Sequence, residues 1–256
     1  MEVGSGAVTA AVWAGTRAVV STSSGVIKVF EGQSEVASFS GHAGKVTALA
    51  MHPSGDILAS VGVDKSYILY DLTSYKQATQ IYTDAGEAKT AYIHLRFADS
   101  PPDLTCAGFH PDGHLFAAGG SDGQIKVFDV KSGTNAANFD GNGAIQALAF
   151  SENGTWLAVV VKGSTSVSIW DLRKSAQLKV LDIGSPIASV VWDYTGQFLV
   201  VAGPSGLSVQ QYSKSTKEWS EPLRSGIPAV AVAWGAQAQS LISLSAEGII
   251  TLLGLR

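Results

Sequence analysis

Cys106, His110 and His114 are the residues of this sequence whose types and spacing come nearest to a reactive site. Cys106 with His110 could supply a thiolate nucleophile and its imidazole base, and His110 with His114 could bind a metal ion. Cys106, however, lies in the middle of an apolar segment, LTCAGF, and His110 begins a Pro-Asp-Gly turn. No third metal ligand follows at a suitable spacing. We therefore predict structural roles for all three, with no catalytic residue, no metal site and no cofactor.

Tryptophan side chains could form an aromatic cage that holds a modified lysine by cation–π contacts. The candidates stand in a column of large side chains, each ending a segment such as IASVVW: Trp13, Met51, Phe109, Phe150, Trp192 and Trp234. Successive members are about 40 residues apart, except for a 58-residue interval before Phe109. A side chain repeated at one period indicates architecture, so we expect the tryptophans in the core between repeats rather than in a cage.

A second column of residues keeps step with the first and has the same 58-residue interval. It consists of Phe30, Tyr70, Phe128, Trp170, Gln210 and Leu253. A period of about 40 residues is typical of the four-stranded blades of a β-propeller. Between the columns lie turns such as HPSGD, followed by apolar runs such as ILASVG that suit strands buried on both faces.

These columns predict an all-β fold, a propeller with six visible repeats in a single domain over residues 1–256. The repeat ranges are about 4–40, 41–83, 104–143, 144–185, 186–227 and 228–256, with an insertion at 84–103. The insertion reads as an extended hairpin between the second and third repeats. Because loops on a rigid scaffold often bind partners, we expect a protein contact at Tyr92, His94, Arg96 and Phe97, against the alternative of a self-packed loop.

Composition narrows the class of function. The net charge is −4, no run of Lys and Arg exceeds two residues, and Cys106 is the only cysteine. Direct nucleic-acid binding is therefore disfavoured, and an internal disulfide is excluded. The sequence has neither an apolar run of about 20 residues nor the plan of a signal peptide, so we expect a soluble, intracellular protein with no membrane contact.

Short motifs in the repeats resemble those of WD repeats. Phe128-Asp129 and Trp170-Asp171 stand at the position of the name-giving Trp-Asp pair, as does Tyr70 with the Asp that follows it. In that family a His, an Asp in the turn before the third strand and the Trp form a buried hydrogen-bond network.

The WD resemblance assigns such a network to the second repeat, with His42, Asp64 and Tyr70, where Tyr replaces Trp. Asp122 keeps the turn aspartate of the third repeat without the His, and Trp170 with Asp171 keeps the pair in the fourth. These departures imply weaker networks than the family has, so packing between blades must supply most of the stability.

The two ends of the sequence predict an unfinished ring. WD propellers close by sharing one blade between both ends of the chain. Segment 7–13 is already the first strand of a blade, and the last repeat supplies strands near 228–234, 241–245 and 249–253 without a fourth. We expect that a closing strand is missing, or that the last sheet keeps an unpaired edge.

A longer stretch resembles one family in particular. The motifs are LTCAGFHPDG (104–113), SDGQIKVFDV (121–130), TNAANF (134–139), AFSENG (149–154) and SIWDLRK (168–174). Their order is similar to that in the C-terminal WD40 domain of the pre-mRNA-processing factor 19 family of splicing factors and U-box ubiquitin ligases. The resemblance implies a seven-bladed propeller, of which the first blade is absent here, within a longer nuclear protein.

The same resemblance implies a role. The propeller would recognise ubiquitination substrates and partners in the splicing complex, in a family linked to splicing, ubiquitin conjugation and DNA repair. Full-length members form a homotetramer through a coiled coil and transfer ubiquitin through a U-box, and neither element is visible in this sequence. Two alternatives remain: a WD40 scaffold of another intracellular complex, and a propeller hydrolase, which would need carboxylates converging on its central channel.

Overall fold

The computed structural model describes residues 6–82, 103–132 and 134–254, and the positions of the chain's two compact units relative to one another are not determined. The described residues form β-strands and one 3-10 turn, η1 (Ala236–Ala238). None of the described residues forms a helix that could cross a lipid bilayer.

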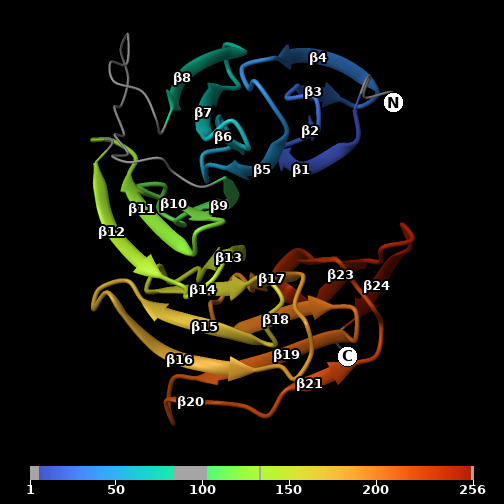
Figure 1. Cartoon of the computed structure of the whole chain (residues 1–256). Helices are drawn as coiled ribbons and strands as arrows, with labels where there is room; N and C mark the ends of the chain where they lie inside the picture. The colour runs from blue at the N-terminus through green and yellow to red at the C-terminus, as the bar shows by residue number, and fades with distance from the viewer. Residues whose placement is uncertain (1–5, 83–102, 133, 255–256) are drawn as a thin grey trace. The chain divides into compact units, whose positions relative to one another are not determined.

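The N-terminal unit, Met1–Asp140, contains three four-stranded antiparallel sheets (Figure 1). The first sheet consists of β1 (Val8–Ala14), β2 (Arg17–Thr22), β3 (Ile27–Glu31) and β4 (Ser34–Phe39). The second consists of β5 (Val46–Met51), β6 (Ile57–Gly62), β7 (Ser66–Asp71) and β8 (Lys76–Tyr82). The third consists of β9 (Leu104–Phe109), β10 (Leu115–Gly120), β11 (Gln124–Asp129) and β12 (Asn135–Asp140).

The C-terminal unit, Gly141–Arg256, contains the other three described sheets. The fourth sheet consists of β13 (Ile145–Phe150), β14 (Trp156–Val161), β15 (Ser166–Asp171) and β16 (Ala176–Asp182). The fifth consists of β17 (Ser189–Trp192), β18 (Phe198–Gly203), β19 (Gly206–Ser213), β20 (Glu218–Trp219) and β21 (Leu223–Ser225). The sixth consists of β22 (Ala231–Trp234), β23 (Ser240–Leu244) and β24 (Ile250–Gly254). The predicted all-β class with six repeats is confirmed.

Within the sheets, consecutive strands pair through short connections, and many of these contain a residue with a positive φ. In the HPSGD and HPDGH turns, Gly55 (φ 77°) and Gly113 (φ 75°) occupy the left-handed region, and each donates its N–H to the carbonyl of the histidine that begins its turn. A side chain at Gly113 would also collide with the His52 ring. Glycine is therefore required at that turn for two reasons.

The outer strand of each of the first four sheets contains an irregularity at the same place. The register of the third strand with the fourth shifts between Val29 and Phe30, and likewise beside Tyr70, Phe128 and Trp170. Each shift is the signature of a β-bulge. The bulge recurs beside the first four residues of the second column, so these repeats share backbone geometry as well as residue type.

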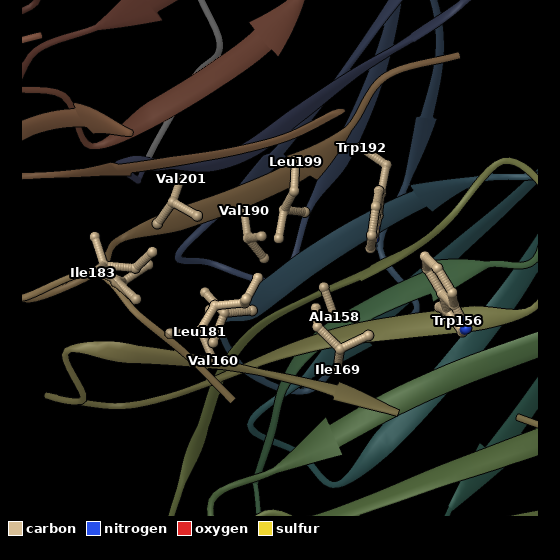
Figure 2. Close-up of a cluster of buried hydrophobic side chains, with 12 residues drawn as sticks. Trp156, Ala158, Val160, Ile169, Leu181, Ile183, Val190, Trp192, Leu199 and Val201 are labelled. Atoms are coloured by element: carbon tan, nitrogen blue, oxygen red, sulfur yellow. The ribbon is translucent and has the colours of Figure 1, made fainter. Parts of the chain in front are cut away.

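Aliphatic side chains on facing strands form the cores between sheets. Figure 2 shows the cluster between the fourth and fifth sheets, where Trp156 and Trp192 lie close together beside Leu199, and Leu181 lies among shorter aliphatic groups. The Trp156 and Trp192 rings are 5.9 Å apart, and Tyr212 stands edge-on to Trp156 at 4.6 Å. This packing buries Trp192, as the column predicted.

Trp13 contradicts the prediction for the column. Its side chain is 70% exposed. Ala10, Val12 and Ala14 pack into the core between the first and second sheets, and the alternation of the strand puts Trp13 on the opposite face of β1. Its place in the column therefore predicts which way the side chain points, but not whether another sheet covers it.

Candidate functional site

His42 and Asp64 meet at one end of the second sheet. His42 lies in the segment before β5, and Asp64 lies in the turn between β6 and β7. The His42 Nδ1 atom is 2.9 Å from Asp64 Oδ1, and the backbone N–H of Ala43 donates to Asp64 Oδ2 over 2.8 Å. The structure thus brings together two of the three residues that the WD resemblance assigned to a network.

Two serines that the sequence reasoning missed complete this group. His42 Nε2 lies 2.7 Å from the hydroxyl of Ser60 in β6, and the Ser66 hydroxyl donates to Asp64 Oδ1 over 2.9 Å. Ser60 is a polar residue in the apolar run ILASVG, and that contrast was the available signal. We call His42, Ser60, Asp64 and Ser66 the His42 network.

The His42 network has the chemical order of a hydrolytic triad, Asp–His–Ser. An imidazole that donates its Nδ1 proton to Asp64 can accept the Ser60 proton at Nε2. Ser60 has no exposed surface, however, and His42 is also buried. Because no acyl group can reach the Ser60 oxygen, this geometry supports a structural tie and not catalysis.

The pKa of Asp64 agrees with a structural role for the His42 network. Burial by itself raises the pKa of this carboxyl group, but the hydrogen bonds from His42 and the Ala43 N–H outweigh burial and hold the pKa below its usual range. Asp64 is therefore an anion at neutral pH. Its charge is held by hydrogen bonds rather than by bulk water.

Tyr70 lies beside the network without closing it. Its ring packs 4.5 Å from that of Phe39 in β4, and its hydroxyl has no hydrogen-bond partner among the described residues. Burial raises the pKa of Tyr70 to about 12. Tyr70 therefore contributes to the junction of the first and second sheets mainly by packing.

The aspartates of the name-giving pairs cap turns. Asp71, Asp129 and Asp171 each follow the aromatic residue of a third strand and accept backbone N–H groups two or three residues further on. Asp171 is buried and accepts from Arg173 and Lys174. The half-buried Trp170 pairs across β15 with Leu157 and Gln177.

Asp122 caps a different turn, the one before β11. It accepts the N–H of Gln124 over 2.9 Å, in an exposed position. Asp122 therefore accepts a backbone N–H in its turn, as Asp64 does. No histidine is among the contacts observed for Asp122.

Cys106, His110 and His114 have ordinary environments for structural residues. Burial raises the pKa of the Cys106 thiol to about 12, so the thiol is protonated at neutral pH. Asp112 lies 2.7 Å from His110 Nδ1 and 3.4 Å from His114 Nδ1. In residues 6–82, 103–132 and 134–254, no group of three or more His, Cys, Asp or Glu side chains could hold a metal ion.

A shallow pocket of about 600 Å³ lies beside the hairpin between β19 and β20. Its lining is polar, with Gln197, Lys214 and Glu218 around the half-buried ring of Trp219.

The predicted partner contact at Tyr92, His94, Arg96 and Phe97 falls outside the described residues, so it stays a prediction.

Comparison with known proteins agrees with the repeat geometry. The family model "WD domain, G-beta repeat" matches residues 33–71, 95–129 and 133–171. The chain also resembles a chain in a crystal structure of the mitotic checkpoint complex, with a TM-score of 0.81 over 99% of this chain and 76% of that one, at 17% identity. An identity this low shows a shared fold and nothing more.

Sequence relatives are more specific. Pre-mRNA-processing factor 19 homolog 2 of Arabidopsis thaliana is 35% identical over 139 residues, which is 54% of this chain and 23% of that protein. Pre-mRNA-processing factor 19 of Dictyostelium discoideum is 35% identical over 149 residues, 56% of this chain and 24% of that protein. The matches thus span about a quarter of these relatives. The chain is therefore an all-β protein with WD40 repeats and with homology, over about half of its length, to pre-mRNA-processing factor 19.

Proposed function

We propose that this chain is a protein-interaction scaffold in pre-mRNA splicing. The observation that carries the proposal is the homology to pre-mRNA-processing factor 19 from several organisms. The physical character of the sheets is compatible with it. Their cores are packed, and the Asp–His–Ser arrangement of the His42 network is buried. A role in binding partners at the surface therefore fits these sheets better than a role in catalysis.

We further propose that the chain is the recognition propeller of a U-box ubiquitin ligase that acts in the nucleus. In this role it would bind ubiquitination substrates and splicing partners, and the whole protein would be a homotetramer with seven blades in its propeller. Ubiquitin transfer would depend on a U-box, so we assign no step of the transfer to residues of this chain.

The splicing proposal is tested by RNA retention. The purified chain is immobilised and incubated with a splicing-competent nuclear extract, and the retained spliceosomal small nuclear RNAs are quantified against an unrelated WD40 propeller. We expect selective retention, because a scaffold of a splicing complex holds its RNA through proteins. Equal retention by both propellers would instead favour a scaffold of another intracellular complex.

The insertion offers a sharper test within the same assay. Replacing Tyr92, His94, Arg96 and Phe97 together by alanine should reduce the retained RNA, because aromatic and Arg side chains dominate protein interfaces. Alanine at Asp84, Glu87 and Lys89 provides the matched control in the same insertion. If both variants behave like the unaltered chain, partners bind elsewhere.

A further inference from the structure

The fifth sheet departs from the repeat along its outer edge. In each of the first four sheets a single strand covers the third strand, whereas two short strands, β20 and β21, share the edge of β19 (Figure 1). β20 pairs with Tyr212 and Ser213, and β21 pairs with Leu207, Ser208 and Val209. The shallow pocket of about 600 Å³ lies at the β20 end of this divided edge.

The pocket is built by the fifth sheet alone, since every residue that lines it belongs to that sheet or to its turns. In the hairpin between β19 and β20, the Lys217 N–H donates to the Ser213 carbonyl over 2.8 Å, and the Thr216 N–H donates to the Ser213 hydroxyl over 3.3 Å. Across the edge, the Gln211 N–H donates to the Ser220 hydroxyl over 3.0 Å. These bonds form the wall of the pocket before any ligand binds, which lowers the cost of binding.

Four polar side chains of the lining are available to a ligand. Lys214 and Glu218 are exposed, and among the described residues neither forms an ion pair with the other or with a third residue. The side-chain amides of Gln197 and Gln211 likewise have no hydrogen-bond partner in the described part of the chain. The lining thus offers one ammonium group, one carboxylate and two amides, each of which both donates and accepts.

A peptide segment matches this set of groups. Its main-chain amides can pair with those of Gln197 and Gln211, and side chains of opposite charge can pair with Lys214 and Glu218. In an extended segment residues two apart project on the same side, so one segment can present both charges to the pocket. A polyanion such as RNA would instead meet the Glu218 carboxylate on a chain whose net charge is −4. The pocket is also shallow, whereas a small-molecule site buries most of its ligand.

We propose that this pocket is a docking site for an extended segment of a partner protein. A basic side chain of the segment pairs with Glu218, and an acidic side chain two residues away pairs with Lys214. This inference rests on the scaffold role proposed above and gives the chemistry of one partner contact.

Titration of the purified, isotope-labelled chain with short peptides, followed by nuclear magnetic resonance, tests the proposal. The probes are Gly-Arg-Ala-Glu-Gly, the reversed order Gly-Glu-Ala-Arg-Gly and the neutral Gly-Ala-Ala-Ala-Gly, all with blocked ends. We expect one charged order to bind about 10-fold more tightly than the neutral peptide, because two surface ion pairs form. Glu218→Gln and Lys214→Gln should each weaken that binding by about 3- to 5-fold.

The charge dependence separates direct contact from a general change in the surface. Glu218→Gln should abolish the preference for Arg over Gln in the peptide while keeping the preference for Glu, and Lys214→Gln should do the reverse. Glu221→Gln and Lys217→Gln make the same charge changes nearby, outside the lining, and should leave the Kd unchanged.

Equal binding of charged and neutral peptides would overturn the proposal, as would a Kd that Glu218→Gln and Lys214→Gln leave unaltered, or no binding at millimolar peptide. A longer form of the protein that no longer binds the peptide would assign the pocket to packing within the chain, which also overturns it. The titration contains no nuclear extract, so its failure leaves the RNA-retention result standing. Loss of RNA retention with intact peptide binding would refute the splicing role alone.

Discussion

The second and fourth sheets have the same strand order and the same bulge, yet different groups hold them together. Ser60 in the second sheet and Val159 in the fourth occupy the same register position, one opposite Ile68 and the other opposite Ser168. Where the second sheet has the Asp64 carboxylate, the fourth has the hydroxyl of Ser164, six residues before Trp170.

The two sheets have the same backbone arrangement but are stabilised by different kinds of interaction. The second sheet encloses a charged hydrogen-bond network, whereas the fourth relies on Trp156 and its aromatic neighbours in the fifth sheet. The contribution of apolar packing to stability does not depend on pH, whereas the contribution of a network that contains a carboxylate does. The same backbone can therefore be stabilised in a pH-dependent or a pH-independent way, and substitutions can separate the two.

Trp156→Ala should cause the largest loss of stability. Truncating a buried aromatic side chain leaves a cavity and costs about 3–5 kcal/mol. Urea unfolding followed by circular dichroism measures the loss, with Leu178→Ala as an exposed control in the same sheet. A loss below about 1 kcal/mol would mean that the aromatic cluster does not hold the fourth sheet.

His42→Ala should lower the free energy of unfolding by about 2–4 kcal/mol, because Asp64 keeps its charge and loses its imidazole partner. Hydrogen exchange followed by mass spectrometry should show faster exchange in β5, β6 and β7 and no change in β13 to β15. His114→Ala, at an exposed imidazole, is the control. Equal acceleration in both sheets would show that the network is not local to the second.

Asp64→Asn tests the pH dependence. The folded-state pKa of Asp64 is held below its unfolded value, so its contribution to stability is complete above about pH 4 and is lost as the pH falls through the folded pKa. At pH 7 the variant should be less stable by about 1.5–3 kcal/mol, and the difference should vanish in acid. A difference that stays constant across pH would contradict the role of the charge.

Ser164→Ala should have the smallest effect. The Ser164 hydroxyl accepts the N–H of Ser166 over 3.0 Å, and a neutral bond of this kind contributes about 0.5–1.5 kcal/mol. Unfolding measured at pH 7 and again in acid should give the same loss, since no carboxylate is involved. If the loss at pH 7 matched that of Asp64→Asn, the two positions would not differ as the structure suggests.

The sequence predicted the repeats well because spacing and register express the same periodicity. Tyr70, Phe128 and Trp170 fall at equivalent places in their sheets, because each pairs with the second residue of the second strand of its sheet. The strands expected near 241–245 and 249–253 correspond to β23 and β24.

The other features could not be predicted, because they depend on which residues meet in three dimensions. Serine is common in strands, so Ser60 gains meaning only when β6 places it against the His42 ring. The exposure of Trp13 is likewise invisible in a column, which reports on the face of a strand and not on what covers it. Register shifts leave no periodic trace at all, because one extra residue fits within the ordinary variation of loop length.

The recurring bulge has a consequence for solubility. An outer strand with a regular edge presents a straight ladder of peptide groups that another strand can extend, which is how sheets grow into fibrils. A register shift on β4, β8, β12 and β16 bends each of these ladders, whereas β24 pairs with β23 without a shift. The first four residues of the second column thus mark places where the fold discourages fibril growth, whereas the outer strands β20, β21 and β24 of the fifth and sixth sheets pair without a shift.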